Sequence, residues 1–140
     1  MGVVLITTTQ QTLQPGQALA FEAMTDNRCK CNTKCNGVCV SSLDFSPKIC
    51  ERGDYNISLK ANITGQTGPV QIALAVGGVV LPYTTLISNP AISNVFNAVS
   101  ECLPIHVSCC DRGRITVVNN GTNPVVIGAG AFLAVSRKCC

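Results

Sequence analysis

The sequence predicts an all-β protein, folded as an antiparallel sandwich or barrel. Apolar residues recur at every second position through most of the chain, which is the period of a strand lying on a core. Clusters of glycine, proline and asparagine interrupt this alternation about every ten residues, and no segment sustains helical spacing. About nine or ten short strands separated by such turns are typical of sandwiches and barrels.

The clearest expected strand runs from Gly53 to Thr64. Its odd-numbered residues from Tyr55 to Ile63 are apolar and the residues between them are polar, so one face is expected to lie on the core. Turn residues follow from Gly65 to Pro69, and the alternation resumes from Val70 to Val76. We expect these two segments to form a hairpin.

The other expected strands have shorter or less regular alternation. They are Val3 to Thr8, Ala18 to Met24, Val38 to Phe45, Val79 to Ser88, Ile92 to Ser100, Pro104 to Ser108, Arg114 to Asn119 and Val125 to Arg137.

Residues 1–140 are expected to form one domain, because neither an internal repeat nor an interdomain linker interrupts the pattern. Residues 1–17 are a candidate extended amino-terminal arm. Three arrangements stay open for the amino-terminal residues: packing on their own domain, exchange into a neighbour, or attachment to another surface. The polar, cysteine-rich segment 26–37 is expected to be a long loop.

Composition argues against several partners. Only 12% of the residues are charged and the net charge is +3 without a basic stripe, so no nucleic-acid partner is expected. No apolar run approaches the ~18 residues of a membrane helix, so no membrane partner is expected. The start, MGVVLITTTQ, lacks the basic residues and long apolar stretch of a secretory signal. We expect a soluble protein without a signal peptide, unless one has been removed.

Four segments follow one another in the order of a known plan: Cys50 to Asn62, Val70 to Gly78, Arg114 to Gly121, and Ala131 to Arg137. In this order, roughly residues 40 to 138 of the chain resemble the tumour necrosis factor and complement type trimeric jelly roll. The Gly-x-Tyr that begins the core in that family matches Gly53-Asp-Tyr55. The resemblance implies an antiparallel β-sandwich jelly roll, of the TNF-like kind, that assembles as a homotrimer.

The resemblance also implies which strand meets a second copy. The last strand of that family ends in an apolar run that packs in the trimer centre, and Ala131 to Val135 occupies this place. The candidate interface residues are therefore Phe132, Leu133 and Val135. Neighbouring residues of a strand point to opposite faces, so one of Phe132 and Leu133 is expected to face the partner.

Within the resemblance, small cysteine-containing bacteriophage proteins share the length and the Met-Gly-Val-Val-Leu start of this chain. The leading expectation is a structural protein on the virion surface of a tailed bacteriophage, a capsid decoration or head-fibre protein whose partners are itself and a capsid protein. The alternative is a spore-surface or appendage subunit, resembling the carboxy-terminal domain of collagen-like spore proteins, although the chain has no Gly-x-y repeat. A second alternative is a receptor-binding or glycan-binding knob.

Ten cysteines are more than a core of this size requires. They are Cys29, Cys31, Cys35, Cys39, Cys50, Cys102, Cys109, Cys110, Cys139 and Cys140. Disulfides are the favoured interpretation, some of them between subunits, with on the order of a thousand possible pairings. A zinc site at Cys29, Cys31, Cys35 and Cys39 and buried free thiols stay open as alternatives, although the usual paired metal-ligand spacing is absent.

Other motifs carry weaker signals. Arg52-Gly53-Asp54 matches an adhesion tripeptide, but Gly53 is better explained by a turn. His106 and Cys109 could be written as a nucleophilic pair, yet a solvent-facing or satisfied strand histidine is the favoured interpretation. Asp44, Glu51, Asp54 and Asp111 have no spacing that would define a calcium site. No Gly-x-Ser-x-Gly elbow and no phosphate-binding glycine loop is present, so we expect neither an enzyme nor a cofactor.

The tripeptides that begin at Asn56, Asn62 and Asn120 match glycosylation acceptors. Without a secretory route they are expected to be idle, and Asn56 and Asn62 are simply outward positions of a strand.

Overall fold

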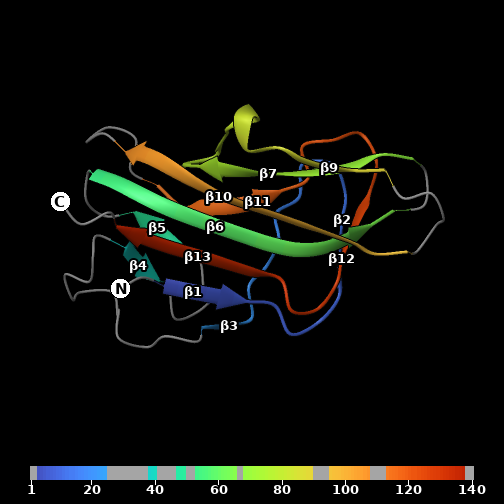
Figure 1. Cartoon of the computed structure of the whole chain (residues 1–140), viewed down its shortest axis with the longest axis horizontal. Helices are drawn as coiled ribbons and strands as arrows, with labels where there is room; N and C mark the ends of the chain where they lie inside the picture. Colours follow the sequence, from blue (N-terminus) through green and yellow to red (C-terminus); the bar gives the residue numbers. More distant parts are fainter. Residues whose placement is uncertain are drawn as a thin grey trace.

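Alternating side chains build two antiparallel layers, which the computed structural model in Figure 1 shows stacked around one core. The structure describes residues 3–24, 38–40, 47–49, 53–65, 68–89, 95–107 and 113–137. The first sheet contains β1 (Val3–Ile6), β2 (Gln11–Leu13), β3 (Ala23–Met24), β6 (Gly53–Thr64), β10 (Asn97–Val107), β12 (Val125–Ile127) and β13 (Phe132–Arg137).

The second sheet is built around β7 (Val70–Val76). Its other strands are β8 (Val79–Val80), β9 (Leu86–Ser88) and β11 (Ile115–Val118), and a 3-10 turn, η1 (Pro82–Thr84), lies between β8 and β9. β4 (Val38–Val40) pairs with β5 (Pro47–Ile49), and a bridge between Lys48 and Arg114 joins β5 to the start of β11. In the described part of the chain, no helix is long and apolar enough to cross a membrane.

The core lies between the inner faces of the two sheets. On β6 the odd-numbered side chains from Tyr55 to Ile63 are buried, as the alternation predicts. The second sheet contributes the even-numbered side chains of β7, with Ile115 and Val117 of β11. Two sheets packed in this way interdigitate their inward side chains over about 10 Å. The antiparallel β-sandwich predicted from the sequence is therefore confirmed.

The predicted hairpin between residues 53–64 and 70–76 is wrong. β6 pairs with β10, β12 and β13, whereas β7 pairs with β8, β9 and β11, so the turn near Gly68 carries the chain from one sheet to the other. A hairpin and a connection between two sheets have the same alternation and the same turn residues, so the sequence pattern did not distinguish them.

Other strand predictions also differ from the structure. Of the expected strand Ala18–Met24, Ala23–Met24 forms β3 and Ala18 forms an isolated bridge with Val118. Pro82 starts a 3-10 turn that splits Val79–Ser88 into β8 and β9. The strands expected on either side of Glu101 form one strand, β10, and Pro104 is tolerated there because β10 pairs only with β6 among the described strands. The expected strand Val125–Arg137 is interrupted between β12 and β13, where Gly130 has a φ of 89°.

The amino-terminal segment is part of the sandwich rather than an extended arm. β1 lies between β13 and β3, and β2 pairs with β12. Glu22 ties the loop between β1 and β2 to the strand that follows, because its carboxylate accepts hydrogen bonds from Thr9 Oγ1 at 2.6 Å, Thr8 Oγ1 at 2.7 Å and Gln11 Nε2 at 3.1 Å. These donors, led by Thr9, lower the pKa of Glu22 to about 2.

Charged residues gather at one end of the sandwich. Asp54 is the second residue of β6, His106 is the last but one of β10, and Arg137 is the last of β13. The registers Val107↔Gly53 and Arg137↔Tyr55 bring these strand ends together. In Figure 1 this is the end at which the arrows of β10 and β13 point. Residues 61–100 and 115–136, which supply several turns at the opposite end, contain no Asp, Glu, Lys, Arg or His, whereas Glu22 is bonded to the β1–β2 loop near that end. The two ends of the molecule therefore differ strongly in charge.

Candidate assembly face

The outer face of the first sheet has a continuous run of four paired strands, β1, β13, β6 and β10. The registers align its outward residues in rows across the four strands. One row is Val4, Ala134, Ser58 and Cys102, and the next is Ile6, Phe132, Lys60 and Ser100. Figure 1 shows these strands lying side by side. We call this surface, defined by these eight residues, the assembly face.

The assembly face is apolar on one side and polar on the other. Val4, Ile6, Phe132 and Ala134 are half-buried in the single chain, whereas the residues from β6 and β10 are small or polar. Lys60 is the one charged residue in the two rows, and it makes no ion pair with any described residue. Apart from Lys60, whose charge must stay in water or find a partner, a face of this composition has little electrostatic cost when it is covered by another protein surface.

The structure corrects the predicted interface residues. Leu133 and Val135 have exposed fractions of 0% because their side chains point into the core of their own chain. They have no surface to offer a partner. Phe132 points outward beside Ile6 and Lys60, and Ala134 shares its direction. Of the three predicted residues, Phe132 alone can contribute to a contact between copies.

A polar pair lies at the charged end of the same sheet. His106 Nδ1 lies 2.7 Å from Asp54 Oδ1, and the two side chains have exposed fractions of 72% and 62%. The outward, exposed histidine agrees with the favoured sequence interpretation. Cys109, its suggested partner in a nucleophilic pair, lies outside the described residues, as do Asp44, Glu51, Arg52 and Asp111.

Cys102 is the one cysteine whose side chain the structure describes. Its thiol is exposed and free, and Ser58 Oγ donates a hydrogen bond to its sulfur at 3.3 Å. Cys39 lies in β4, where only the backbone is described, and the other eight cysteines lie outside the described residues. The described residues hold no group of three His, Cys, Asp or Glu side chains that could bind a metal.

The sequence analysis identified the outward residues of β6 but not the face they belong to. Alternation shows that Ser58 and Lys60 point away from the core. It does not show that β13 lies on one side of them and β10 on the other, because those strands are about forty or more residues away in the chain. The sequence analysis did not identify four residues of the assembly face, which are Val4, Ile6, Ala134 and Ser100.

Comparison with known proteins adds information on the fold. No family model and no curated protein matches the sequence. Among solved structures, the Eiger TNF from S. frugiperda matches with a TM-score of 0.73 at 7% identity, covering 99% of this chain and 92% of that one. Murine APRIL matches with a TM-score of 0.56 at 12% identity, covering 98% of each chain.

The PRD1 vertex protein P5 has a TM-score of 0.52 at 12% identity, and the match covers 98% of this chain and 96% of that one. At such low identity these similarities show the fold alone. They agree with the antiparallel sandwich described above. The chain therefore has the TNF-like antiparallel β-sandwich jelly-roll fold.

Proposed function

We propose that the chain is a non-catalytic structural subunit that forms a homotrimer on the surface of a particle. The particle we favour is the virion of a tailed bacteriophage, with the chain acting as a capsid decoration or head-fibre protein. Its partners are then other copies of itself and a capsid protein. A spore surface is the alternative location, and the fold similarity to a vertex protein is compatible with the first choice.

The observation that carries the proposal is the assembly face. Val4, Ile6 and Phe132 form an outward apolar side on the first sheet, and no acidic residue lies in the two rows. Covering apolar surface contributes about 25 cal/mol for each Å² removed from water. A second copy of the chain supplies a surface of matching size whose one charged residue is Lys60, as the resemblance to trimeric jelly rolls implies.

Cross-linking by cysteines is supported by where the strands end. Cys50 lies three residues before Gly53, Cys109 two residues after Val107, and Cys139 two residues after Arg137. Gly53 pairs with Val107, and Arg137 pairs with Tyr55. A chain spans up to about 3.3–3.6 Å per residue, so the sequence separations allow cysteines attached to these strand ends to approach one another.

Oligomeric state tests the assembly. Light scattering coupled to size exclusion should give three times the 14.6 kDa of one chain. Phe132→Asp places a charge on the assembly face and should yield monomers. Ile87→Asp, at a position that is 64% exposed on the second sheet, is the matched control and should stay trimeric. A monomeric wild-type chain, or a trimeric Phe132→Asp variant, would contradict the proposal.

Gel electrophoresis with and without reductant tests the cross-links. Bands of two or three chains without reductant support bridges between subunits. A single-chain band in both lanes limits the cysteines to bridges within one chain or to free thiols.

Immunogold electron microscopy of purified particles tests the location. Antibody against the chain should label the heads of intact virions. Labelling of spores supports the alternative, and absence from both kinds of particle contradicts a surface subunit.

A further inference from the structure

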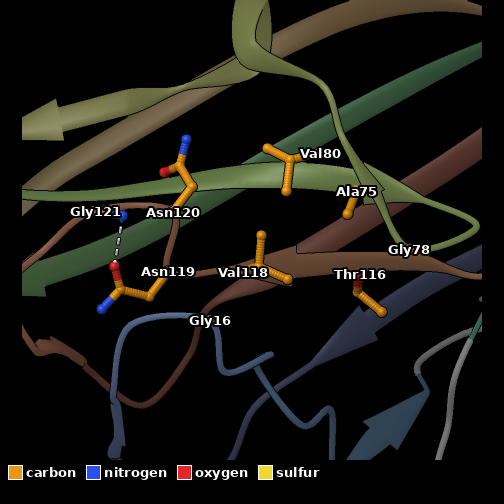
Figure 2. Close-up of a pocket in the computed structure, with 9 residues that line it drawn as sticks. All are labelled: Gly16, Ala75, Gly78, Val80, Thr116, Val118, Asn119, Asn120 and Gly121. Atoms are coloured by element: carbon orange, nitrogen blue, oxygen red, sulfur yellow. Dashed lines mark hydrogen bonds between the residues drawn. The ribbon is translucent and has the colours of Figure 1, made fainter.

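A hollow lies on the outer face of the second sheet, on the side of the molecule away from the assembly face. Figure 2 shows it between β7, β8 and β11, closed at one end by the loop after β11 and by Gly16. Its volume is about 390 Å³, which is within the range of about 300–1,000 Å³ found for small-molecule sites. It is lined by Gly16, Ala75, Gly78, Val80, Thr116, Val118, Asn119, Asn120 and Gly121.

The hollow exists because the outward side chains at its floor are small. Ala75 pairs with Val80 on one side and with Thr116 on the other, so a methyl group occupies the middle of this row. Ala73 occupies the equivalent outward position beside Val118. Larger side chains at these two positions of β7 would fill the space that the valines and the threonine enclose.

The lining is apolar at its floor and polar but uncharged at its rim. Val80 and Val118 provide the apolar surface, while the Thr116 hydroxyl and the Asn120 amide provide hydrogen-bonding groups. Asn120 Oδ1 is shielded from water and has no partner among the described residues, although Nδ2 donates to Thr85 Oγ1 at 3.0 Å. Because water does not reach this oxygen, a ligand in the hollow does not reach it either, and the hydrogen-bonding group that Asn120 can offer is the second N–H of Nδ2.

Asn119 holds the closed end of the hollow in place. It is fully buried, and its Nδ2 donates to Leu13 O at 3.0 Å and to Asn123 O at 2.8 Å. Its Oδ1 accepts from Gly121 N at 2.9 Å, the dashed line in Figure 2, and its carbonyl accepts from Gly16 N at 2.8 Å. The wall is therefore preorganised, so little conformational entropy is lost when a ligand binds.

Charge around the hollow selects the kind of ligand. None of the lining residues is ionisable, and the nearest charge along β11 is Arg114, two residues before Thr116. An ionised ligand group removed from water here would have no opposite charge among the lining residues. A pyranose ring fits this lining better, because it has an apolar C–H face for the valines and hydroxyl groups for Thr116 and Asn120.

We propose that this hollow binds a neutral saccharide unit of a glycan. The proposal is independent of trimer formation, because the hollow and the assembly face are on different sheets. Since the hollow is open, one face of the sugar stays in water, and binding to a single unit is expected to be weak.

Saturation-transfer NMR with glucose, galactose, mannose and N-acetylglucosamine at millimolar concentration tests binding, and amide shifts in a labelled sample locate it. At least one of these sugars should bind and shift the amides of Gly16, Gly78 and Gly121. Thr116→Val removes one hydroxyl at nearly constant shape and should weaken binding about fivefold. Val118→Glu should abolish it, whereas the control Ile87→Glu, outside the hollow, should leave it unchanged.

Circular dichroism melting of each variant shows whether the fold is kept, and Thr116→Val provides the result if Val118→Glu does not fold. The proposal is overturned if none of the four sugars binds, if Thr116→Val and a folded Val118→Glu bind as the wild type does, or if N-acetylneuraminic acid binds more tightly than every neutral sugar.

Discussion

The central strands of the two sheets, β6 and β7, are supported in different ways. β6 is paired with β10 from Gly53 to Ile63 on one side and with β13 and then β12 on the other. β7 has β11 on one side, but its other side is shared by two short strands that leave Leu74 between them. There Thr84 Oγ1 accepts a hydrogen bond from Leu74 N at 2.9 Å and donates to Leu81 O at 2.6 Å.

This difference shows how much specific chemistry a strand needs. A strand with continuous neighbours needs only a correct alternation, because the neighbours satisfy its backbone groups. A strand whose neighbours are interrupted depends on particular side chains at fixed positions, or on a glycine where no side chain fits. Substitutions at such single positions should therefore damage the second sheet, and the effects below run from the largest to the smallest.

Gly113→Ala should destabilise the chain most, by about 3 kcal/mol. A Cβ at Gly113 would lie 2.6 Å from Gly77 Cα and 2.9 Å from Gly77 N, at the point where the turn after β7 meets the start of β11. Both contacts are with backbone, which cannot rotate away as a side chain does. Urea unfolding measures the change. Gly16→Ala, with no atom within 4 Å but a φ of 87°, is the control and should cost about 1–2 kcal/mol.

Asn119→Ala should cost about 2–3 kcal/mol, because it leaves two buried carbonyls and one N–H without their side-chain partner. Urea unfolding again provides the measurement. Asn89→Ala, at an exposed position, should change stability by less than about 0.5 kcal/mol. Equal effects of the two substitutions would show that the loop after β11 does not depend on its buried amide.

Thr84→Val should cost about 2 kcal/mol by removing the hydroxyl that satisfies Leu74 N. Thr84→Ser keeps that hydroxyl and should recover most of the loss. Hydrogen exchange can locate the effect, since the Leu74 amide should lose protection more than amides in the middle of β6. Uniform loss in both sheets would contradict the idea that β7 depends on this one side chain.

Glu101→Gln should have the smallest effect, under about 1 kcal/mol, and it should depend on pH. Burial raises the pKa of Glu101 above its ordinary value of 4.5, and its Oε1 has no hydrogen-bond partner among the described residues. The ionised form is therefore disfavoured in the folded state, so stability falls as the pH rises from 4.5 through the raised pKa. The variant should melt at a higher temperature than wild type at pH 7, and the difference should vanish below pH 4.5.

Glu22→Gln gives the opposite dependence and serves as the control. Because the pKa of Glu22 is lowered from 4.5 to about 2, its stabilisation is complete above pH 4.5 and is lost as the pH falls toward 2. The variant should be less stable than wild type at pH 7, with a difference that shrinks on acidification. Parallel pH profiles for the two variants would show that the environments of the carboxylates are not opposite.

Sequence patterns predicted β6 completely and β7 completely, because each has an uninterrupted alternation and a clear turn at its end. They did not predict β2, whose residues Gln11 and Thr12 are polar and whose strand character comes from pairing with β12. They also interpreted residues 119–124 only as turn chemistry. Nothing in that polar segment shows that Asn119 is fully buried and holds the segment to Leu13.

The assembly face and the hollow could also be predicted only in part from the sequence. Alternation predicted that Phe132 and Leu133 face opposite ways, and the structure then identified Phe132 as the outward one. The rows that cross β1, β13, β6 and β10 depend on strand order, which joins residues from the two ends of the chain. The hollow depends on Ala75 beside Val80 and Thr116, a combination of small neighbours that only the register brings together.

The pairing of β1 with β13 has a practical consequence for rearranging the polypeptide. Val3 and Val135 are register partners, so the first and last strands begin and end beside each other. A short flexible linker could therefore join them, and the chain could be opened instead at the exposed turn of Gly77 and Gly78. Such a circular permutant would keep every strand pair described above while moving its new ends to the rim of the second sheet.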